Sequence, residues 1–316
     1  MKLIESKAEY ILQEEGLEGI YKMIELAGRT AYHSLDKITP DSAKDFVDRM
    51  IKSKHGAALE AGTVYLEKPA GFYENDNVKY ELNPYSKSEC MSYTGMGEKV
   101  YFEGEKYIIS TNYRVLVENN WLDDLQYLCS PTEFHEKRYT MRFTCSRAIA
   151  QELTRHRVFS FLMESQRYIR GEIVFVIPSW FQIFKEEGKY DGEIRDGSNR
   201  IVLGGKTFQL SSVQGFEEHY MCSRLAEAEH AYFHFLKQGY TPQQARDILP
   251  NATKTELIMT GFASDWRFLM DLRLFEKTGK VHPDMLDLMQ KAQKAMQEAG
   301  IWEDIMSKPS KFDLYY

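Results

Sequence analysis

The chain has 316 residues and a formal net charge of −7, and its residues are 43% hydrophobic and 28% charged. This length allows one large domain or two of ordinary size, with a sizeable core in either case. The acidic charge argues against a dedicated nucleic-acid binder, because such proteins gain most of their affinity from a cationic surface. No segment approaches the roughly 20 apolar residues that a membrane-spanning helix needs, so the composition predicts a soluble globular protein.

The N-terminus and the cysteines bear on the cellular compartment. Residues 1–7 alternate charged with apolar side chains and lack the uninterrupted apolar stretch of a secretory signal. The four cysteines are far apart and show no Cys-x-x-Cys spacing: Cys90, Cys129, Cys145 and Cys222. This spacing favours free thiols over a disulfide framework or a zinc site. We therefore expect a cytoplasmic protein.

The first third of the chain has the pattern of helix, helix and strand. Apolar residues recur with helical spacing at Ile20, Met23, Ile24 and Ala27. Thr39 as N-cap and Pro40 at the first helical position predict a second helix, which Gly56 is available to end. Residues 63–68 are then expected to be extended.

The middle of the chain contains two long breaks in this pattern. Residues 69–106 and 185–206 show no sustained helical or strand period, which predicts excursions outside the core. Between the breaks, residues 139–145 alternate apolar and polar side chains, which predicts a strand with one wet or polar face. Ser146 can cap a following helix that ends close to Arg155.

The last third is mainly helical. A long amphipathic helix is expected to end at Gly239, and residues 241–244 combine an N-cap, a proline and a capping-box glutamine. Residues 254–260 have the composition of a strand, and helices are expected over 264–275 and 283–299. Strands and helices are therefore mixed along the whole chain.

The greatest concentration of ligand-binding chemistry lies in residues 155–168. This segment reads Arg-His-Arg-Val-Phe-Ser-Phe-Leu-Met-Glu-Ser-Gln-Arg-Tyr and places cations and hydroxyls beside aromatic rings. Arginine forks bind phosphate oxygens through two hydrogen bonds, so the segment suits a flat, phosphorylated ligand. The alternative is an exposed charged helix end, where the helix dipole favours cations by roughly 0.3–1 kcal/mol.

This segment resembles the signature of the flavin-dependent thymidylate synthases. That signature is Arg-His-Arg, seven residues, then Ser, with Arg-Tyr shortly after, and each fixed position is matched. The Ala-Arg-Asp-Ile-Leu-Pro of residues 245–250 is similar to the family's Ala-Arg-x-x-Leu-Pro, and Leu272-Arg273 is similar to its late Leu-Arg. Weaker similarities lie at residues 27–30 and 55–60.

The resemblance implies a set of binding residues. Arg155, His156 and Arg157 would contact FAD. The residues that would bind dUMP are Arg155, Ser165, Arg167, Arg246 and Arg273. Of these, Ser165 and Arg273 would also be catalytic, since an arginine near the uracil carbonyls stabilises charge that develops on the ring. No metal is expected, because Ala231 stands where a His-Glu-x-x-His zinc site built on His230 and His234 would need glutamate.

The resemblance also implies a reaction and an architecture. The enzyme would be a methyltransferase that converts dUMP to dTMP, with 5,10-methylenetetrahydrofolate as carbon donor and NADPH-reduced FAD as hydride donor. The expected fold is α/β (α+β), with mixed helices packed on a mainly antiparallel sheet. Residues 1–316 would form a single domain with insertions near 69–106 and 185–206. A homotetramer with active sites between subunits is expected, with dUMP and folate as ligands and with no nucleic acid or membrane partner.

No cysteine nucleophile is needed in this mechanism. None of the four cysteines stands beside a histidine or within the motif, so none is predicted to be catalytic.

Three departures from the family pattern leave alternatives open. Ala61 replaces a His that the family commonly has, and Phe268 replaces a His or Asn; both positions lie near the flavin in the family. Leu162 and Met163 replace a common Asn-Glu. The alternatives are a non-catalytic flavin- or nucleotide-binding relative and, from another class, a protein that contacts RNA through the same arginines. Flavin absorbance of the purified protein separates the synthase and its non-catalytic relative, which both bind a flavin or nucleotide, from the RNA-contacting protein.

Overall fold

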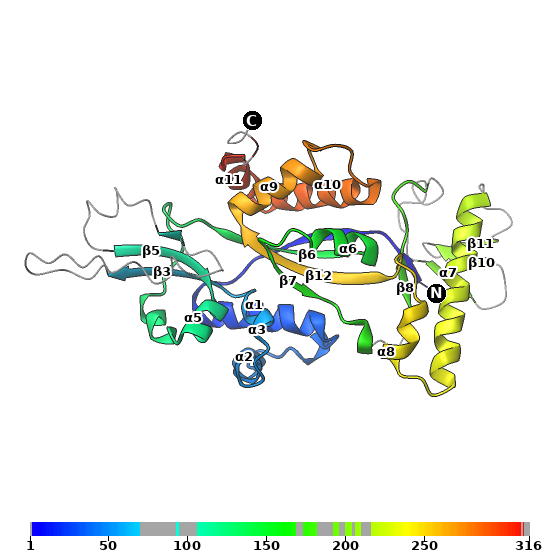
Figure 1. Cartoon of the computed structure of the whole chain (residues 1–316), viewed down its shortest axis with the longest axis horizontal. Helices are drawn as coiled ribbons and strands as arrows, with labels where there is room; N and C mark the ends of the chain where they lie inside the picture. Colours follow the sequence, from blue (N-terminus) through cyan, green and yellow to red (C-terminus); the bar gives the residue numbers. More distant parts are fainter. Residues whose placement is uncertain are drawn as a thin grey trace, which may run out of the picture.

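The computed structural model describes residues 2–69, 93–94, 106–168, 173–181, 192–195, 200–203, 206–209, 216–310 and 312. Within these residues the strands form three sheets. The central sheet has helices on both faces, and the other two sheets lie at opposite ends of an elongated molecule (Figure 1). The expected mixture of helices with mainly antiparallel pairing is confirmed, but the strands form three sheets where one was expected.

The central sheet is antiparallel throughout and has the strand order β2-β6-β12-β7. Its strands are β2 (Lys7–Ile11), β6 (Arg138–Ser146), β12 (Lys254–Phe262) and β7 (Ser160–Met163). Strands β6 and β12 pair over nine residues each, from Lys254 opposite Ser146 to Phe262 opposite Arg138. This long ladder is the frame to which the arginine-bearing segments attach.

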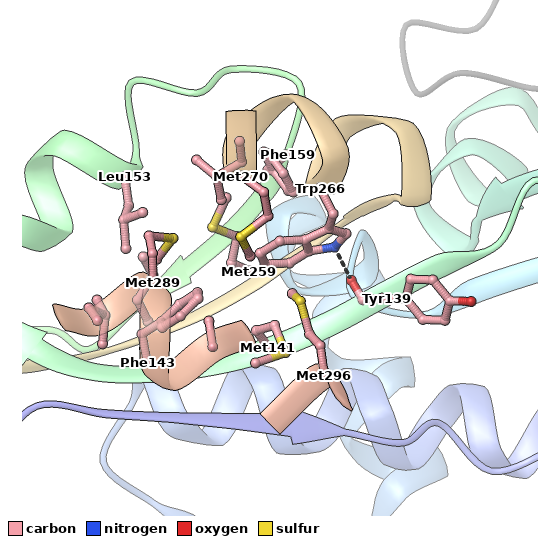
Figure 2. Close-up of a cluster of buried hydrophobic side chains, with 14 of the residues drawn as sticks. Tyr139, Met141, Phe143, Leu153, Phe159, Met259, Trp266, Met270, Met289 and Met296 are labelled. Atoms are coloured by element: carbon pink, nitrogen blue, oxygen red, sulfur yellow. Dashed lines mark hydrogen bonds between the residues drawn. The ribbon is translucent and has the colours of Figure 1, made fainter. Parts of the chain in front are cut away.

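One face of the central sheet carries the largest apolar cluster. Helices α6, α9, α10 and α11 supply it together with Met141 and Phe143 of β6 (Figure 2). The indole of Trp266 lies at its centre, with the ring of Phe159 at 4.8 Å in an edge-on contact. The indole N–H donates to the carbonyl of Tyr139 at 3.1 Å, so burial leaves no donor unpaired on this ring. These helices are α6 (Arg147–Leu153), α9 (Ala263–Arg273), α10 (Pro283–Glu298) and α11 (Trp302–Ser307).

The opposite face of β6 is polar but not wet. Thr140 and Thr144 are buried, because helix α1 (Gly16–Ala31) lies over this face and packs Met23 and Ala27 against Ile258 of β12. The two hydroxyls of Thr140 and Thr260 hydrogen-bond each other at 2.9 Å. The expected polar face is therefore confirmed, but it is not wet, since alternation alone cannot distinguish a solvated face from one covered by another helix.

Helix α2 (Ser42–Lys52) packs beside α1 and begins later than expected. Asp41, not Thr39, is its N-cap. The Ser42 hydroxyl donates to the Thr39 carbonyl at 3.0 Å, so the segment with Pro40 forms a turn before the helix. Gly56 does not end α2 but begins the short helix α3 (Gly56–Leu59).

The sheet at one end has the order β3-β5-β4 and is antiparallel. Its strands are β3 (Thr63–Pro69), β5 (Lys106–Asn112) and β4 (Tyr93–Thr94), and helix α5 (Tyr113–Asn119) follows β5. Apart from β4, the interior of the expected insertion 69–106 lies outside the described residues.

The sheet at the other end has the order β11-β10-β9-β1-β8. Its strands are β1 (Lys2–Ile4), β8 (Val174–Val176), β9 (Gly192–Arg195), β10 (Arg200–Leu203) and β11 (Lys206–Gln209). Strands β9 and β10 lie inside residues 185–206, where no strand was expected. Four-residue strands are too short to display a period-2 pattern clearly, so the sequence pattern did not predict them.

Helices α7 (Phe216–Lys237) and α8 (Pro242–Ala245) lie beside this end sheet (Figure 1). Gly239 has φ +89°, as expected of a residue that ends a helix. The backbone N–H of Thr241 donates to Oε1 of Gln244 at 3.0 Å, which is one half of the predicted capping box. The described helices include none that is long and apolar enough to cross a membrane.

Candidate active site

The Arg-His-Arg segment lies just beyond the C-terminus of α6. The hydroxyl of Ser146 accepts from the backbone N–H of Ile149 at 3.4 Å and so caps the start of this helix, as predicted. The helix ends at Leu153, whose carbonyl accepts from the backbone N–H of His156 at 3.0 Å. This turn leaves Arg155 and Arg157 exposed, with His156 half-buried between them.

His156 is held by the last residue of α9. Nε of Arg273 donates to Nε2 of His156 at 3.1 Å, and Nη1 of Arg273 lies 3.8 Å from the Glu152 carboxylate. Burial, together with the positive charges of Arg273 and Arg155, lowers the pKa of His156 to about 4. The imidazole is therefore neutral at pH 7, and since Nε2 accepts, its proton is on Nδ1.

The residues just described, Arg155, His156, Arg157 and Arg273, form the first group of predicted site residues. A second group forms around the loop that follows β7. The backbone N–H of Ser165 donates to the carbonyl of Ala31 at 3.0 Å, which ties this loop to the end of α1. The Ser165 hydroxyl accepts from the backbone N–H of Arg167 at 3.3 Å, at the start of the 3-10 turn Gln166–Tyr168. The side chain of Arg167 is exposed.

Arg147 joins this second group, although the sequence did not single it out. Its Nη1 donates to Oε1 of Gln166, next to Ser165. Burial and the nearby charge of Arg246 lower the pKa of Arg147, so the two guanidinium charges are close enough to repel each other. One signal was available: Arg147 is the first residue of α6, where the helix dipole disfavours a cation.

The exposed or half-buried arginines of the two groups share one property. Within the described residues, no carboxylate lies within ion-pair distance of Arg147, Arg155, Arg157, Arg167 or Arg246.

Of the predicted site residues, His156 and Arg273 contact each other directly, and Ser165 and Arg167 belong with Arg246 through Arg147. Within the described residues, no hydrogen bond joins the two groups. Unpaired guanidinium groups at a surface favour anionic ligands.

Glu164 fixes the loop that carries Ser165. Its side chain is only 4% exposed, and its carboxylate lies 2.8 Å from Nε2 of His33 and 3.0 Å from Nζ of Lys254. It also accepts from the backbone N–H of Glu256 at 2.9 Å. One buried carboxylate thus connects the loop to β12 and to the turn after α1, a role that the motif did not indicate.

Two of the positions that depart from the family pattern, Ala61 and Phe268, differ in their surroundings. Ala61 is 2% exposed and packs in the cluster of Met23, Ala27 and Ile258, under the central sheet. The ring of Phe268 stacks on that of Phe312, with centroids 5.6 Å apart and planes 26° apart. Ala61 is therefore a packing residue in this chain, and Phe268 is partly covered by the C-terminal segment.

One cysteine does lie beside a histidine in space. Sγ of Cys129 is 3.8 Å from Nε2 of His135, a contact between residues six positions apart that the sequence did not suggest. Burial raises the pKa of Cys129 to about 11 and lowers that of His135. The pair is therefore a neutral thiol and a neutral imidazole, the opposite of an activated nucleophile. Within the described residues there is also no cluster of three or more metal-binding side chains.

Comparisons with known proteins agree with the motif. The family described as "Thymidylate synthase complementing protein" matches residues 103–299. The flavin-dependent thymidylate synthase of Corynebacterium efficiens is 30% identical over 132 residues, 42% of this chain and 47% of that protein. That of Pyrococcus furiosus is 27% identical over 166 residues, 51% and 53% of the two chains.

The chain spans about half the length of these curated relatives. A solved structure of the UMP/dUMP methylase PolB from Streptomyces cacaoi, bound with 5-Br dUMP, has a TM-score of 0.42 and 14% identity, and the match covers 97% of each chain. The family match alone extends over more than half of the 316 residues and includes the Arg-His-Arg segment, the loop of Ser165 and Arg273. This chain belongs to the thymidylate synthase complementing protein family.

Proposed function

We propose that the protein is a flavin-dependent thymidylate synthase that converts dUMP to dTMP. In this proposal FAD is the cofactor, NADPH the reductant and 5,10-methylenetetrahydrofolate the carbon donor, and the chain works as a cytoplasmic homotetramer. The observation that carries the proposal is that Arg147 donates to Gln166, between Ser165 and Arg167 in the chain, and is close enough to Arg246 to feel its charge, while none of the three arginines has a carboxylate partner among the described residues. Family membership supports the same reaction.

The second group suits the phosphate of dUMP. Arg147 and Arg246 lie close enough for the charge of one to lower the pKa of the other. A phosphate dianion between them relieves this repulsion and accepts paired hydrogen bonds from planar guanidinium groups. The Ser165 hydroxyl, which already accepts from the N–H of Arg167, can donate its own proton to a phosphate oxygen.

The first group suits the uracil ring. Arg273 is oriented by His156 on one side and Glu152 on the other, so its free N–H groups point in a fixed direction. A guanidinium fixed near a uracil carbonyl stabilises the negative charge that develops on oxygen as the ring becomes nucleophilic. Because His156 is neutral, it does not compete with Arg273 for this charge.

Arg155, His156 and Arg157 are the residues that would hold FAD. Two exposed cations flank a neutral imidazole that can donate from Nδ1, a donor set that fits a diphosphate. When bound, the flavin supplies the hydride for reduction of the methylene group. Arg155 and Arg157 lie at the surface of the chain, so a second subunit that covered a ligand on them would place the active site between subunits.

A non-catalytic relative is the second candidate, and Phe268 is the residue that favours it. The family has a polar residue at this position, but here the ring is stacked on Phe312. Such a protein would bind the nucleotide or flavin without turnover.

Two measurements on the purified chain test the proposal. Visible absorbance after incubation with FAD and gel filtration should show a bound flavin, and NADPH oxidation should depend on dUMP. A protein that binds dUMP but never retains FAD would contradict the enzyme hypothesis. Flavin binding with NADPH oxidation that is indifferent to dUMP would favour the second candidate.

A further inference from the structure

A second basic site lies next to the loop of Ser165. It is a cavity of about 450 Å³ between the C-terminal ends of α1 and α2 and the 3-10 turn Leu35–Lys37. The lining includes four basic and two aromatic residues: Arg29, Lys37, Arg49, His55, Tyr32 and Phe46. Among the described residues that line it, none is acidic.

The positive charge of this cavity is only partly neutralised. Buried Arg29 donates from Nε to Glu25 at 2.6 Å, a carboxylate outside the lining. Within the described residues, neither Lys37 nor Arg49 forms an ion pair. The guanidinium of Arg49 instead lies 5.1 Å from the centroid of Phe46. Cations gathered in a concave site and only partly balanced by carboxylates attract an anionic ligand.

Flat rings line the same cavity. The Tyr32 hydroxyl is 2.9 Å from Nδ1 of His55, and the two rings are tilted by 31° with centroids 6.3 Å apart. Tyr32 is 38% exposed, so part of its ring is open to a ligand. Aromatic faces beside arginines suit an anion that also contains a planar ring.

One short turn, residues 31–34, separates this cavity from the loop of Ser165. Ala31 and His33 contact the loop: the Ala31 carbonyl accepts from Ser165, and Nε2 of His33 lies 2.8 Å from Glu164. The intervening Tyr32 and the following Ser34 line the cavity instead. A ligand in the cavity therefore lies on the opposite side of this turn from the loop of Ser165.

We propose that this cavity binds the p-aminobenzoyl-glutamate tail of the folate co-substrate. The inference rests on the proposed function, which requires a folate close to dUMP. A folate tail contains a planar ring followed by carboxylates, and each added γ-linked glutamate brings one more negative charge. The arginines assigned above to dUMP and FAD lie outside the cavity lining, so this basic site is left for the folate or for NADPH, and competition by ADP distinguishes the carboxylates of the first from the phosphates of the second.

The test compares Arg49→Ala with Lys52→Ala. Both residues are exposed cations on α2, but only Arg49 lines the cavity. Equilibrium dialysis with radiolabelled tetrahydrofolate triglutamate measures binding to the full chain loaded with FAD and dUMP. Arg49→Ala should raise the Kd roughly fivefold, the loss expected for one exposed charge contact, and Lys52→Ala should leave it unchanged. The effect of Arg49→Ala should be smaller for the monoglutamate and should shrink at high salt.

Three outcomes would overturn the inference. Equal Kd values for the two variants would show that Arg49 does not contact the folate. If Arg49→Ala weakened binding of the monoglutamate and the triglutamate equally, the cavity would not bind the added glutamate carboxylates. Displacement of the triglutamate by ADP at lower concentration than by polyglutamate would assign the cavity to a phosphate ligand. Because dialysis measures binding, these results stand apart from dTMP formation, whose absence would contradict the proposed function instead.

Discussion

Arg273 and His156 come from elements more than a hundred residues apart and meet through a single hydrogen bond, from Nε of the arginine to Nε2 of the imidazole at 3.1 Å. The bond requires a neutral histidine, because a protonated imidazole has no acceptor to offer. Burial and two neighbouring cations provide this by lowering the pKa of His156 to about 4. The contact joins the Arg-His-Arg segment to the end of α9.

This contact makes stability depend on pH. The unfolded chain protonates His156 near its ordinary pKa of 6.5, whereas the folded chain does so only near 4. The unfolded state therefore binds more protons between these values, and the stabilisation is complete above pH 6.5 and is lost as pH falls towards 4. His156→Gln keeps an acceptor for Arg273 but removes the titration.

Urea unfolding at pH 7.5 and 5.0 checks this prediction. The free energy of unfolding of the wild type should fall by about 1 kcal/mol more than that of His156→Gln, after allowance for solvent screening of a half-buried group. His230→Gln replaces an exposed histidine on α7 and should behave like the wild type. An identical fall in wild type and His156→Gln would show that His156 does not titrate as described.

Arg147 should contribute to dUMP binding as much as the arginines within the motifs. We expect Arg147→Ala, Arg167→Ala and Arg246→Ala each to weaken dUMP binding by about 1.5–3 kcal/mol, the usual contribution of a hydrogen bond to a charged group. Isothermal titration calorimetry measures the effect, and Arg224→Ala on α7 is the control. Uridine, which lacks the phosphate, should bind weakly to all variants. If the wild type bound uridine as tightly as dUMP, these arginines would have another role.

Glu164 should act on dUMP through the position of the Ser165 loop. Glu164→Gln keeps the size of the side chain but weakens its contacts with His33 and Lys254. A small displacement of the loop should raise KM for dUMP by about tenfold. Glu25→Gln is the matched control, since Glu25 is also a buried carboxylate paired with a cation, Arg29.

Both variants should lower the free energy of unfolding, by about 1–3 kcal/mol each. Only Glu164→Gln should change KM for dUMP, and Glu164→Asp should restore part of the affinity. A similar rise in KM in both variants would reduce Glu164 to a purely structural residue.

The cysteines should be dispensable for turnover. Cys129 is the strongest candidate for a contrary result because it lies near His135, yet burial raises its pKa to about 11. Burial also raises the pKa of Cys145 to about 12. Replacement of each cysteine by serine should leave the rate of dTMP formation within a few-fold. A folded single variant without activity would require a mechanism with a cysteine nucleophile.

The sequence predicted those parts of the fold that have a long, regular pattern. Helix α10, expected over 283–299, repeats its apolar residues over four turns, and the residues with this spacing are all buried: Met285, Leu288, Met289, Ala292 and Met296. Strand β6 was predicted from its alternation, but the burial of its polar face depends on α1, which lies more than a hundred residues away. Periodicity specifies which residues share a face but not what covers that face.

The site was predictable only where a motif carried it. The Arg-His-Arg segment, Ser165 and Arg273 were found through resemblance, and the structure joins His156 to Arg273. Arg147 and Glu164 were missed, because their partners Gln166, His33 and Lys254 meet them through the folding of β7, β12 and α1. Glu164 has no local spacing that distinguishes it from an ordinary surface charge, and the only local signal for Arg147 is its place at the start of α6, directly after the Ser146 cap.

The most direct test of the account is dTMP formation by the purified chain supplied with FAD, NADPH, dUMP and 5,10-methylenetetrahydrofolate. Mass spectrometry of the nucleotide pool should show dTMP, and omission of the folate, the reductant or FAD should abolish it. The family resemblance implies that Phe268 replaces a polar residue near the flavin; such a loss should weaken FAD binding by roughly 1–2 kcal/mol, so excess FAD belongs in the assay. Full FAD occupancy with dUMP bound, yet no dTMP, would contradict the proposed synthase activity.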